Sequence, residues 1–175
     1  MVLKTTYQRR LTKPLALYPL KTEGNPVEFT DSVRAILDDK GTNVYCISPN
    51  HTVYDALEHM SRLSIGALVV QEGDQIVGIL SERDYARNIA LKGRNSRDVT
   101  VREIMTGNVI IASPSETVDG CMKLLTGNQI RHLPVAEDGK LIGMITAGDL
   151  VRWIISRQKE TIEQLEHYIA GGYVR

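Results

Sequence analysis

The chain has 175 residues, of which 42% are hydrophobic and 24% charged, a balance typical of a globular protein with one domain or two very small ones. Its 21 basic residues are matched by 21 acidic residues, which argues against a protein that coats nucleic acid or an anionic membrane surface. No apolar run approaches the roughly 18–20 residues that a membrane-spanning helix needs. A local basic site remains compatible with these numbers.

Residues 1–28 are predicted to form an irregular basic leader. Three prolines and a glycine interrupt residues 14–26, and five basic residues but no acidic ones lie between Lys4 and Lys21. Such a segment is similar to an organelle transit peptide and also to a basic tail, and the tail is the preferred interpretation. The expected compartment is the cytoplasm, with an organelle matrix as the alternative if the leader is a transit peptide.

The two cysteines, Cys46 and Cys121, both fall on apolar positions of the pattern. Neither belongs to a CxxC motif or a Cys/His cluster, so we predict two small buried thiols, with a redox role as the alternative. An intracellular compartment is the default for such a chain.

An internal repeat dominates the rest of the sequence. Residues 44–87 align without a gap to residues 109–152 at a constant offset of 65, and 12 of these 44 positions are identical. The identities in the first copy are Val44, Ser48, Pro49, Thr52, Val53, Ile65, Leu68, Val70, Glu72, Gly78, Asp84 and Arg87. Two copies of a unit too small to bury its own apolar face must pack on each other, and the cleft between them is the predicted ligand site.

Each copy is predicted to begin with a helical turn and a short strand. The first turn, within residues 32–37 and capped by Thr30 or Asp31, is repeated at residues 101–105 with an offset of 68. Because the rest of the repeat has an offset of 65, the loop after the first turn is three residues longer than the loop after the second. Strands are expected at residues 44–47 and 109–112, and each is stopped by a Ser-Pro pair, because proline cannot donate a hydrogen bond to a sheet.

The remainder of each copy predicts a helix, a hairpin and a second helix. Apolar residues at helical spacing predict helices over residues 53–63 and 118–125. Paired apolar runs across Gly-Asp or Asp-Gly turns predict hairpins, with strands at residues 67–70 and 76–80 and again at 133–135 and 141–145. The last helices open at Ser81 and Thr146.

The final helix is predicted to continue past Trp153 until Gly171 and Gly172 end it. Its apolar stripe extends beyond the repeat, and we expect it to pack on the repeats or on a second copy of the protein. An independent interaction helix is the alternative. The predicted divisions are therefore a leader at 1–28, repeats at 29–95 and 96–157, and a C-terminal helical extension and tail at 158–175.

The sharpest local motif is a hydroxyl residue followed three positions later by aspartate, Ser81 with Asp84 and Thr146 with Asp149. One interpretation is a capping box, in which the hydroxyl and the acid satisfy backbone N–H groups at the start of a helix. The other is a nucleoside site, in which the carboxylate accepts hydrogen bonds from a vicinal diol such as ribose while helix N–H groups face a phosphate. Both remain open; the similar Thr52–Asp55 pair is interpreted as structural.

A second constellation distinguishes the two copies. Arg131 and His132 precede a buried strand, whereas Gly66 and Ala67 stand at the equivalent positions of the first copy. Either they form a solvated edge, or Arg131 and His132, joined by Arg83, form a phosphate clamp beside a backbone that permits close approach. The second interpretation predicts two clefts that bind ligand unequally.

The duplicated unit resembles a tandem pair of CBS domains, the Bateman module. The resemblance covers residues 31–157 and is carried by the turn Thr100–Met105, the Arg-His-Leu-Pro-Val string from Arg131, and the Gly-x-Ile-Thr-x-x-Asp string from Gly143. It implies an α/β (α+β) fold of two βαββα repeats packed with pseudo-two-fold symmetry. A weaker similarity, from Leu165 to Tyr173, points to stand-alone proteins of this type from bacteria and plant organelles.

The resemblance also implies a ligand and its binding residues. Adenosine compounds are expected, namely AMP, ADP, ATP or NAD(H), with S-adenosylmethionine ranked behind them. Asp84 and Asp149 would hold the ribose, Ser81 and Thr146 the ribose edge or phosphate, and Arg131 with His132 the phosphates. The backbone near Tyr45 and Ile110, with Gly66 and Ala67, would frame the adenine. The absence of a cation at Gly66 and Ala67 puts tight triphosphate binding in the first repeat's cleft in doubt.

The predicted function is a regulatory, signal-transducing sensor of adenine nucleotides that modulates a protein partner or its own assembly, as a homodimer of paired modules. The alternative is a structural or oligomerisation protein with vestigial clefts. We expect no enzyme, catalytic cofactor, metal site, nucleic acid or membrane partner, because no nucleophile elbow, phosphate-binding P-loop or metal-spaced cluster is found, and His51, His59 and His167 are isolated.

Overall fold

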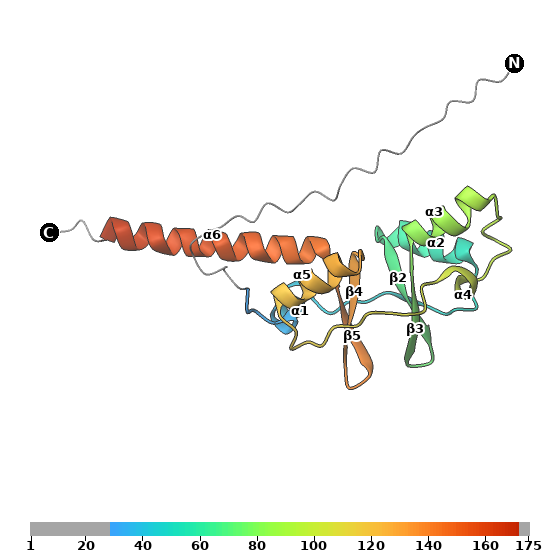
Figure 1. The fold of residues 1–175 in the computed structure, drawn as a ribbon, viewed down its shortest axis with the longest axis horizontal. Helices are drawn as coiled ribbons and strands as arrows, with labels where there is room; N and C mark the ends of the chain where they lie inside the picture. Colours follow the sequence, from blue (N-terminus) through green and yellow to red (C-terminus); the bar gives the residue numbers. More distant parts are fainter. Residues whose placement is uncertain (1–28, 172–175) are drawn as a thin grey trace, which may run out of the picture.

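The computed structural model describes residues 29–171, so the predictions for the leader at 1–28 lie outside the described residues. Figure 1 shows two halves side by side, each with a hairpin and covering helices, and one long helix that projects from the second half. In chain order, the elements before residue 100 are α1 (Val33–Lys40), β1 (Cys46–Ile47), α2 (Val53–Leu63), β2 (Ala67–Glu72), β3 (Gln75–Ser81), α3 (Glu82–Asn88) and a 3₁₀ turn at Ala90–Lys92. The elements after it are α4 (Val101–Ile104), α5 (Val118–Gly127), β4 (His132–Glu137), β5 (Lys140–Thr146) and α6 (Ala147–Gly171).

Both predicted hairpins are confirmed. In the first half β1 pairs in parallel with β2, and β2 pairs antiparallel with β3; in the second half β4 pairs antiparallel with β5. The two hairpins have equivalent registers, with Ala67 opposite Ser81 and His132 opposite Thr146. The repeat in the sequence is therefore a repeat of backbone structure.

The strand predicted at residues 109–112 is reduced to a single bridge between Ala112 and Val135. In the first copy the N–H of Val69 donates to the carbonyl of Tyr45 over 3.1 Å, which helps to form β1. The residue equivalent to Val69 is Pro134, which has no N–H and cannot donate to Ile110 in the same way. Loss of one donor explains why the second copy lacks this strand.

Helix starts follow the predicted capping chemistry with one correction. Thr52 and Asp55 form a reciprocal capping box at α2, as interpreted from the sequence. The N-cap of α1 is Ser32, not Thr30 or Asp31, and its side chain makes no capping hydrogen bond. Instead, the first N–H of that helix, from Val33, donates to the carbonyl of Glu116 over 2.8 Å, a bond to the other half of the chain.

That bond is part of an exchange of leading turns between the halves. α1 precedes the first repeat, but its buried face packs in the core of the second half; α4 precedes the second repeat and packs in the core of the first half. The first exchanged helix buries Val33, Ile36 and Leu37, and the second buries Val101 and Ile104. Each of the two hydrophobic cores therefore contains segments from both parts of the sequence.

Equivalent hydrogen bonds fix both exchanged turns. Val33 N–H donates to Glu116 O over 2.8 Å and Val101 N–H donates to His51 O over 2.9 Å, and these contacts are related by the offsets of the repeat. The ion pair of Arg34 with Glu137 is likewise matched by that of Arg102 with Glu72. The two halves are thus related by an approximate two-fold, and equivalent strand ends meet between them.

α6 begins in the second core and then leaves it. Leu150 is fully buried, and Trp153 and Ile154 are half-buried against the same core, but every residue from Lys159 to Ile169 is exposed. Among residues 29–171, no helix, α6 included, has the length and apolarity required to cross a membrane.

The two cysteines are free thiols. Cys121 is buried in the second core as predicted, and burial together with nearby Glu116 raises its pKa to about 12. Cys46 is only half-buried, and desolvation raises the pKa of its thiol as well. Both are protonated at neutral pH, which is the state expected of packing residues and not of nucleophiles.

Candidate functional site

The end of β3 and the start of β4 form one side each of a cleft of about 320 Å³, here called the arginine cleft. Its volume lies at the lower end of the range typical of small-molecule sites. Its first-repeat residues include Ser81, Arg83, Asp84 and Arg87, and its second-repeat residues run from Asn128 to His132. Ile79 and Ile130 add apolar wall. The structure therefore brings the Ser81–Asp84 motif of one repeat to the Arg131–His132 pair of the other.

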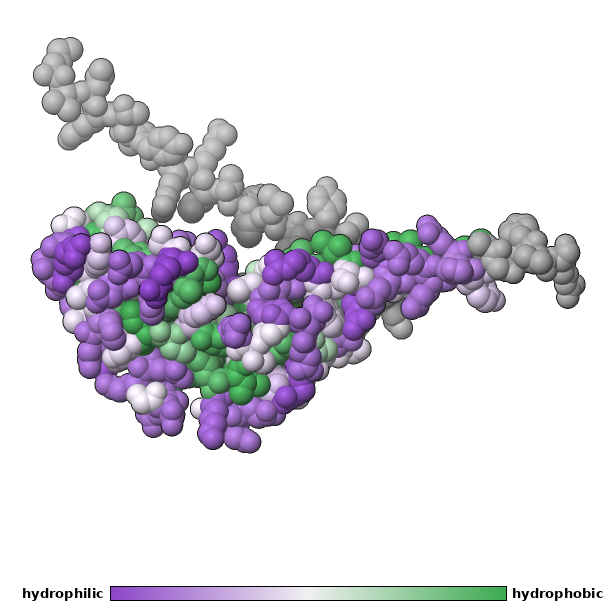
Figure 2. Space-filling model, turned by 180° about the vertical axis from the view of Figure 1, so that it is seen from behind, coloured by the Kyte–Doolittle hydropathy of each residue, from purple (hydrophilic) through white to green (hydrophobic). Residues whose placement is uncertain are grey.

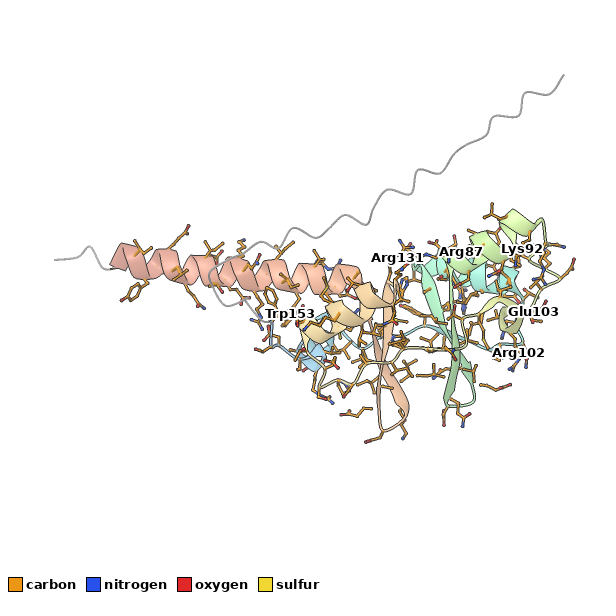
Figure 3. All side chains as sticks on the ribbon, viewed as in Figure 1. Arg87, Lys92, Arg102, Glu103, Arg131 and Trp153 are labelled. Atoms are coloured by element: carbon orange, nitrogen blue, oxygen red, sulfur yellow. The ribbon has the colours of Figure 1, made fainter. Side chains whose placement is uncertain are left out.

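Three guanidinium groups line this cleft. Arg83 donates to the backbone carbonyl of Gln129 over 3.1 Å. Arg87 on α3 and Arg131 before β4 lie at the same edge, between the two halves (Figure 3), and neither forms an ion pair with any of residues 29–171. Unpaired guanidinium groups around a concave surface favour an anion such as phosphate.

Asp84 is placed at the first turn of α3, where it makes a capping box. Its Oδ2 accepts from the N–H of Ser81 over 2.9 Å and from the hydroxyl of Ser81 over 2.6 Å. Its Oδ1 has no hydrogen-bond partner among the described residues and the side chain is half-buried at the cleft wall. Capping and ligand binding are therefore compatible, because they use different oxygens of the same carboxylate.

The second cleft has a volume of about 340 Å³ and is here called the tyrosine cleft. Tyr45, Gly66 and Ala67 of the first repeat face Thr146 and Asp149 of the second. Val44, Ile65 and Met144 contribute apolar surface, and Lys40 and Arg152 contribute charge. This is the counterpart of the arginine cleft under the approximate two-fold.

Asp149 is 7% exposed and is saturated with hydrogen bonds. Its Oδ2 accepts from Thr146 N–H and Oγ1, each over 2.8 Å, and from Nζ of Lys40 over 2.7 Å. Its Oδ1 accepts from Arg152 over 2.5 Å. Burial alone would raise the pKa of Asp149, but the hydrogen bonds from Lys40 and Thr146 outweigh burial and lower it. Lys40 and Arg152 in the tyrosine cleft are thus both paired with Asp149, whereas Arg87 and Arg131 in the arginine cleft have no ion-pair partner among residues 29–171.

His132 lines both clefts. A Cβ built on Gly66 would lie 3.8 Å from its Nε2, so the backbone of the first repeat approaches this imidazole closely. Desolvation, reinforced by the charge of Arg131, lowers the pKa of His132 below its usual value. The side chain is therefore neutral at pH 7, and a phosphate in either cleft would favour its protonated form.

Of the 11 residues predicted for the site, ten line one of these two clefts. Ile110 does not; it packs against the core of the second half. The prediction had not included Arg87, Lys40 or Arg152. Arg87 and Arg152 could have been predicted from the sequence, because they are identical in the two repeats and each follows the motif aspartate by three residues. Lys40 could not, because its counterpart in the second repeat is Asn108.

Comparison with known proteins identifies the family. A family model described as CBS domain matches residues 33–91 and again 101–156, which together make up more than half of the chain. The chain belongs to the CBS domain family and carries two copies of the domain.

Similar proteins share this organisation. The chain is 38% identical over 165 residues to the mitochondrial CBS domain-containing protein CBSX3 of Arabidopsis thaliana, a match that covers 89% of this chain and 79% of the relative. A solved structure of a putative signal-transduction protein with CBS domains from Burkholderia ambifaria aligns with a TM-score of 0.70 and 46% identity, covering 73% of this chain and 96% of that one.

A third relative has been solved with ligands. The CBS domain pair of protein MJ0100, in complex with 5′-methylthioadenosine and S-adenosyl-L-methionine, aligns with a TM-score of 0.64 and 26% identity, covering 73% of this chain and 98% of that one. Both of its ligands contain adenosine.

Proposed function

We propose that this protein is a regulatory module that binds adenine nucleotides in the clefts between its two CBS domains. The observation that carries the proposal is the arginine cleft, where a carboxylate with one unused oxygen, Asp84, stands beside the unpaired guanidinium groups of Arg87 and Arg131. A ribose diol is suited to the carboxylate and a phosphate to the guanidinium groups. The adenosine ligands of the MJ0100 domain pair support the class of ligand.

The clefts are expected to differ in the charge of the ligand they prefer. In the arginine cleft, the phosphates of AMP, ADP, ATP or NAD(H) would form ion pairs with Arg87 and Arg131, which have no carboxylate partner among residues 29–171. In the tyrosine cleft a ligand must compete with Lys40 and Arg152 for Asp149, and the aromatic ring of Tyr45 and the small backbone at Gly66 suit the nucleoside more than its phosphates. S-adenosylmethionine, which carries no phosphate, fits this second cleft better than the first.

As a regulator, the module would need one arrangement of its halves, its dimer or a partner to bind nucleotide more tightly than another, because equal affinity would shift nothing. Catalysis forms no part of the proposal. Assembly as a homodimer through paired modules and a regulated protein partner remain predictions, as does the compartment, for which the mitochondrial location in the name of the Arabidopsis relative is compatible with an organelle matrix.

Calorimetric titration and thermal unfolding with adenosine, AMP, ATP, NADH and S-adenosylmethionine test the proposal. Arg131→Gln should weaken the binding of AMP and ATP at one site by roughly tenfold to a hundredfold, the range for a lost hydrogen bond to a charged group. The affinity for adenosine should be nearly unchanged. Asp84→Asn should weaken adenosine and AMP alike, since it changes the ribose contact.

Arg62→Gln on α2 is the matched control, because this exposed arginine lines neither cleft. The proposal fails if none of the five compounds binds or raises the melting temperature. It also fails if Arg131→Gln and Arg62→Gln change nucleotide affinity equally.

A further inference from the structure

The exposed part of α6 carries an uncovered apolar seam. Val151, Ile155, Ile162, Leu165 and Ile169 are each between 47% and 63% exposed. With Gln158 they follow one another at intervals of four, three, four, three and four residues. This is the heptad spacing of a coiled coil, in which isoleucine occupies every a position (155, 162 and 169) and Val151, Gln158 and Leu165 occupy d.

The opposite side of α6 is held by the protein itself. Trp153 Nε1 donates to Asp31 over 2.8 Å, and Nε of Arg157 lies 3.1 Å from the same carboxylate. Gln158 and Ile162 of the seam line a shallow depression next to Asp31 and Arg157, and both remain exposed. Figure 1 shows α6 projecting beyond the second half, and Figure 2 shows hydrophobic residues along one edge of the projection.

Within residues 29–171, this exposed part of α6 lacks the packing that usually stabilises a helix. Isolated helices of about 12–15 residues are marginal in water, and most helical stability in proteins comes from packing an amphipathic face. The CBS domain matches end at residue 156, so the distal two-thirds of the seam lies outside the ligand-binding repeats. A partner for this face would stabilise both the helix and the apolar side chains.

We infer that the partner is α6 of a second copy, aligned in parallel and in register. Isoleucine at a with leucine at d is the composition that favours parallel two-stranded coils. The polar Gln158 at d favours alignment in register, because it then faces its own counterpart instead of being buried against apolar side chains. The g positions Ile154, Thr161 and Tyr168 are uncharged, so no like charges oppose each other across the parallel interface. This interface is independent of nucleotide binding.

Cysteine cross-linking of the full chain tests the inference. Gln158→Cys places thiols opposite each other at a d position, and oxidation should yield a covalent dimer. Gln164→Cys, the same change at an outward c position, is the matched control and should remain monomeric on denaturing gels, as should the wild-type chain with Cys46 and Cys121. In analytical ultracentrifugation, Ile162→Lys should raise the dimer dissociation constant roughly tenfold or more, because it places a charge where the inferred interface would bury an isoleucine, while AMP affinity is unchanged.

Equal cross-linking of Gln158→Cys and Gln164→Cys would overturn the inference, and so would no cross-linking of either. An antiparallel pair along the whole seam would place residue 158 opposite residue 162, so the preferred cross-link would form between 158 and 162 in a mixture of single cysteine variants and not between two copies of residue 158. Cross-linking at 158 only after deletion of residues 1–28 would assign the seam to the leader and also overturn the inference.

Discussion

The equivalent aspartates Asp84 and Asp149 have different hydrogen-bond partners because their neighbours differ. Asp149 is the only buried charged residue among residues 29–171, and it accepts hydrogen bonds from two cations, Lys40 and Arg152. Among residues 29–171, only Ser81 donates hydrogen bonds to Asp84. In the tyrosine cleft, Asp149 is therefore the centre of two ion pairs. In the arginine cleft, the equivalent Asp84 keeps one carboxylate oxygen available as an acceptor.

Asp149→Asn should lower the free energy of unfolding at pH 7 by about 1–3 kcal/mol, because charge-assisted hydrogen bonds in a buried site are lost. The pKa of Asp149 is lowered in the folded protein, so the unfolded chain binds its proton more tightly. The stabilisation is therefore complete above the unfolded pKa of about 3.9 and disappears as the pH falls through the folded value.

Urea unfolding between pH 7 and pH 3 measures this difference, which should shrink towards zero at the acidic end. Asp84→Asn is the control, with an expected loss below about 1 kcal/mol, since it keeps an acceptor for the cap. A cost for Asp149→Asn that is constant across the whole pH range would contradict the assignment of the ion pairs.

At the scale of elements, each leading turn is pressed against a glycine of the partner hairpin. A Cβ on Gly143 of β5 would lie 2.6 Å from Cδ2 of Leu37 in α1, and a Cβ on Gly78 of β3 would lie 2.5 Å from Sδ of Met105, just after α4. Leu37 is buried and branched, so it has little room to move. The repeated glycine is thus explained by close approach of a helix that belongs to the other repeat.

Gly143→Ala should destabilise the protein by about 1–3 kcal/mol, the cost of overpacking a close-packed core. Gly127→Ala near the end of α5 is the matched control; nothing lies within 4 Å of its added Cβ, and alanine should be neutral or stabilising there. Thermal unfolding measures both. In a double-mutant cycle, Leu37→Ala should relieve most of the cost of Gly143→Ala, and strict additivity would count against the contact.

Local sequence patterns predicted the hairpins, the helices and the Thr52 capping box, since these depend on residues near one another in the chain. They did not predict which core each leading turn joins, because helical spacing defines an apolar face and not its partner. Pro134 could have been interpreted as the loss of a strand donor, since its equivalent is Val69. The role of Lys40 could not have been predicted, because its contact with Asp149 joins residues 109 positions apart and depends on the exchange of α1.

For the whole molecule, the exchange predicts that the two repeats fold and unfold as one unit. The first core contains Val101 and Ile104 from the start of the second repeat, and the second core contains Val33, Ile36 and Leu37 from before the first. Neither core is complete without a segment from the other side of the chain. The clefts lie between the same two halves, so their geometry depends on this exchange as well.

Val33→Ala and Val101→Ala should each lower the free energy of unfolding by about 2 kcal/mol, as expected for truncating a fully buried side chain. Because unfolding is expected to be cooperative across both cores, each substitution should speed hydrogen exchange of the most protected amides in both hairpins to the same extent. Fluorescence of Trp153, the single tryptophan, reports the second core and should give the same transition as amide exchange in the first. Leu91→Ala, at a side chain that is 83% exposed, is the control and should change neither. If Val33→Ala accelerated exchange only in β4 and β5, the halves would unfold separately, and the exchanged turns would be docked segments and not parts of a shared fold.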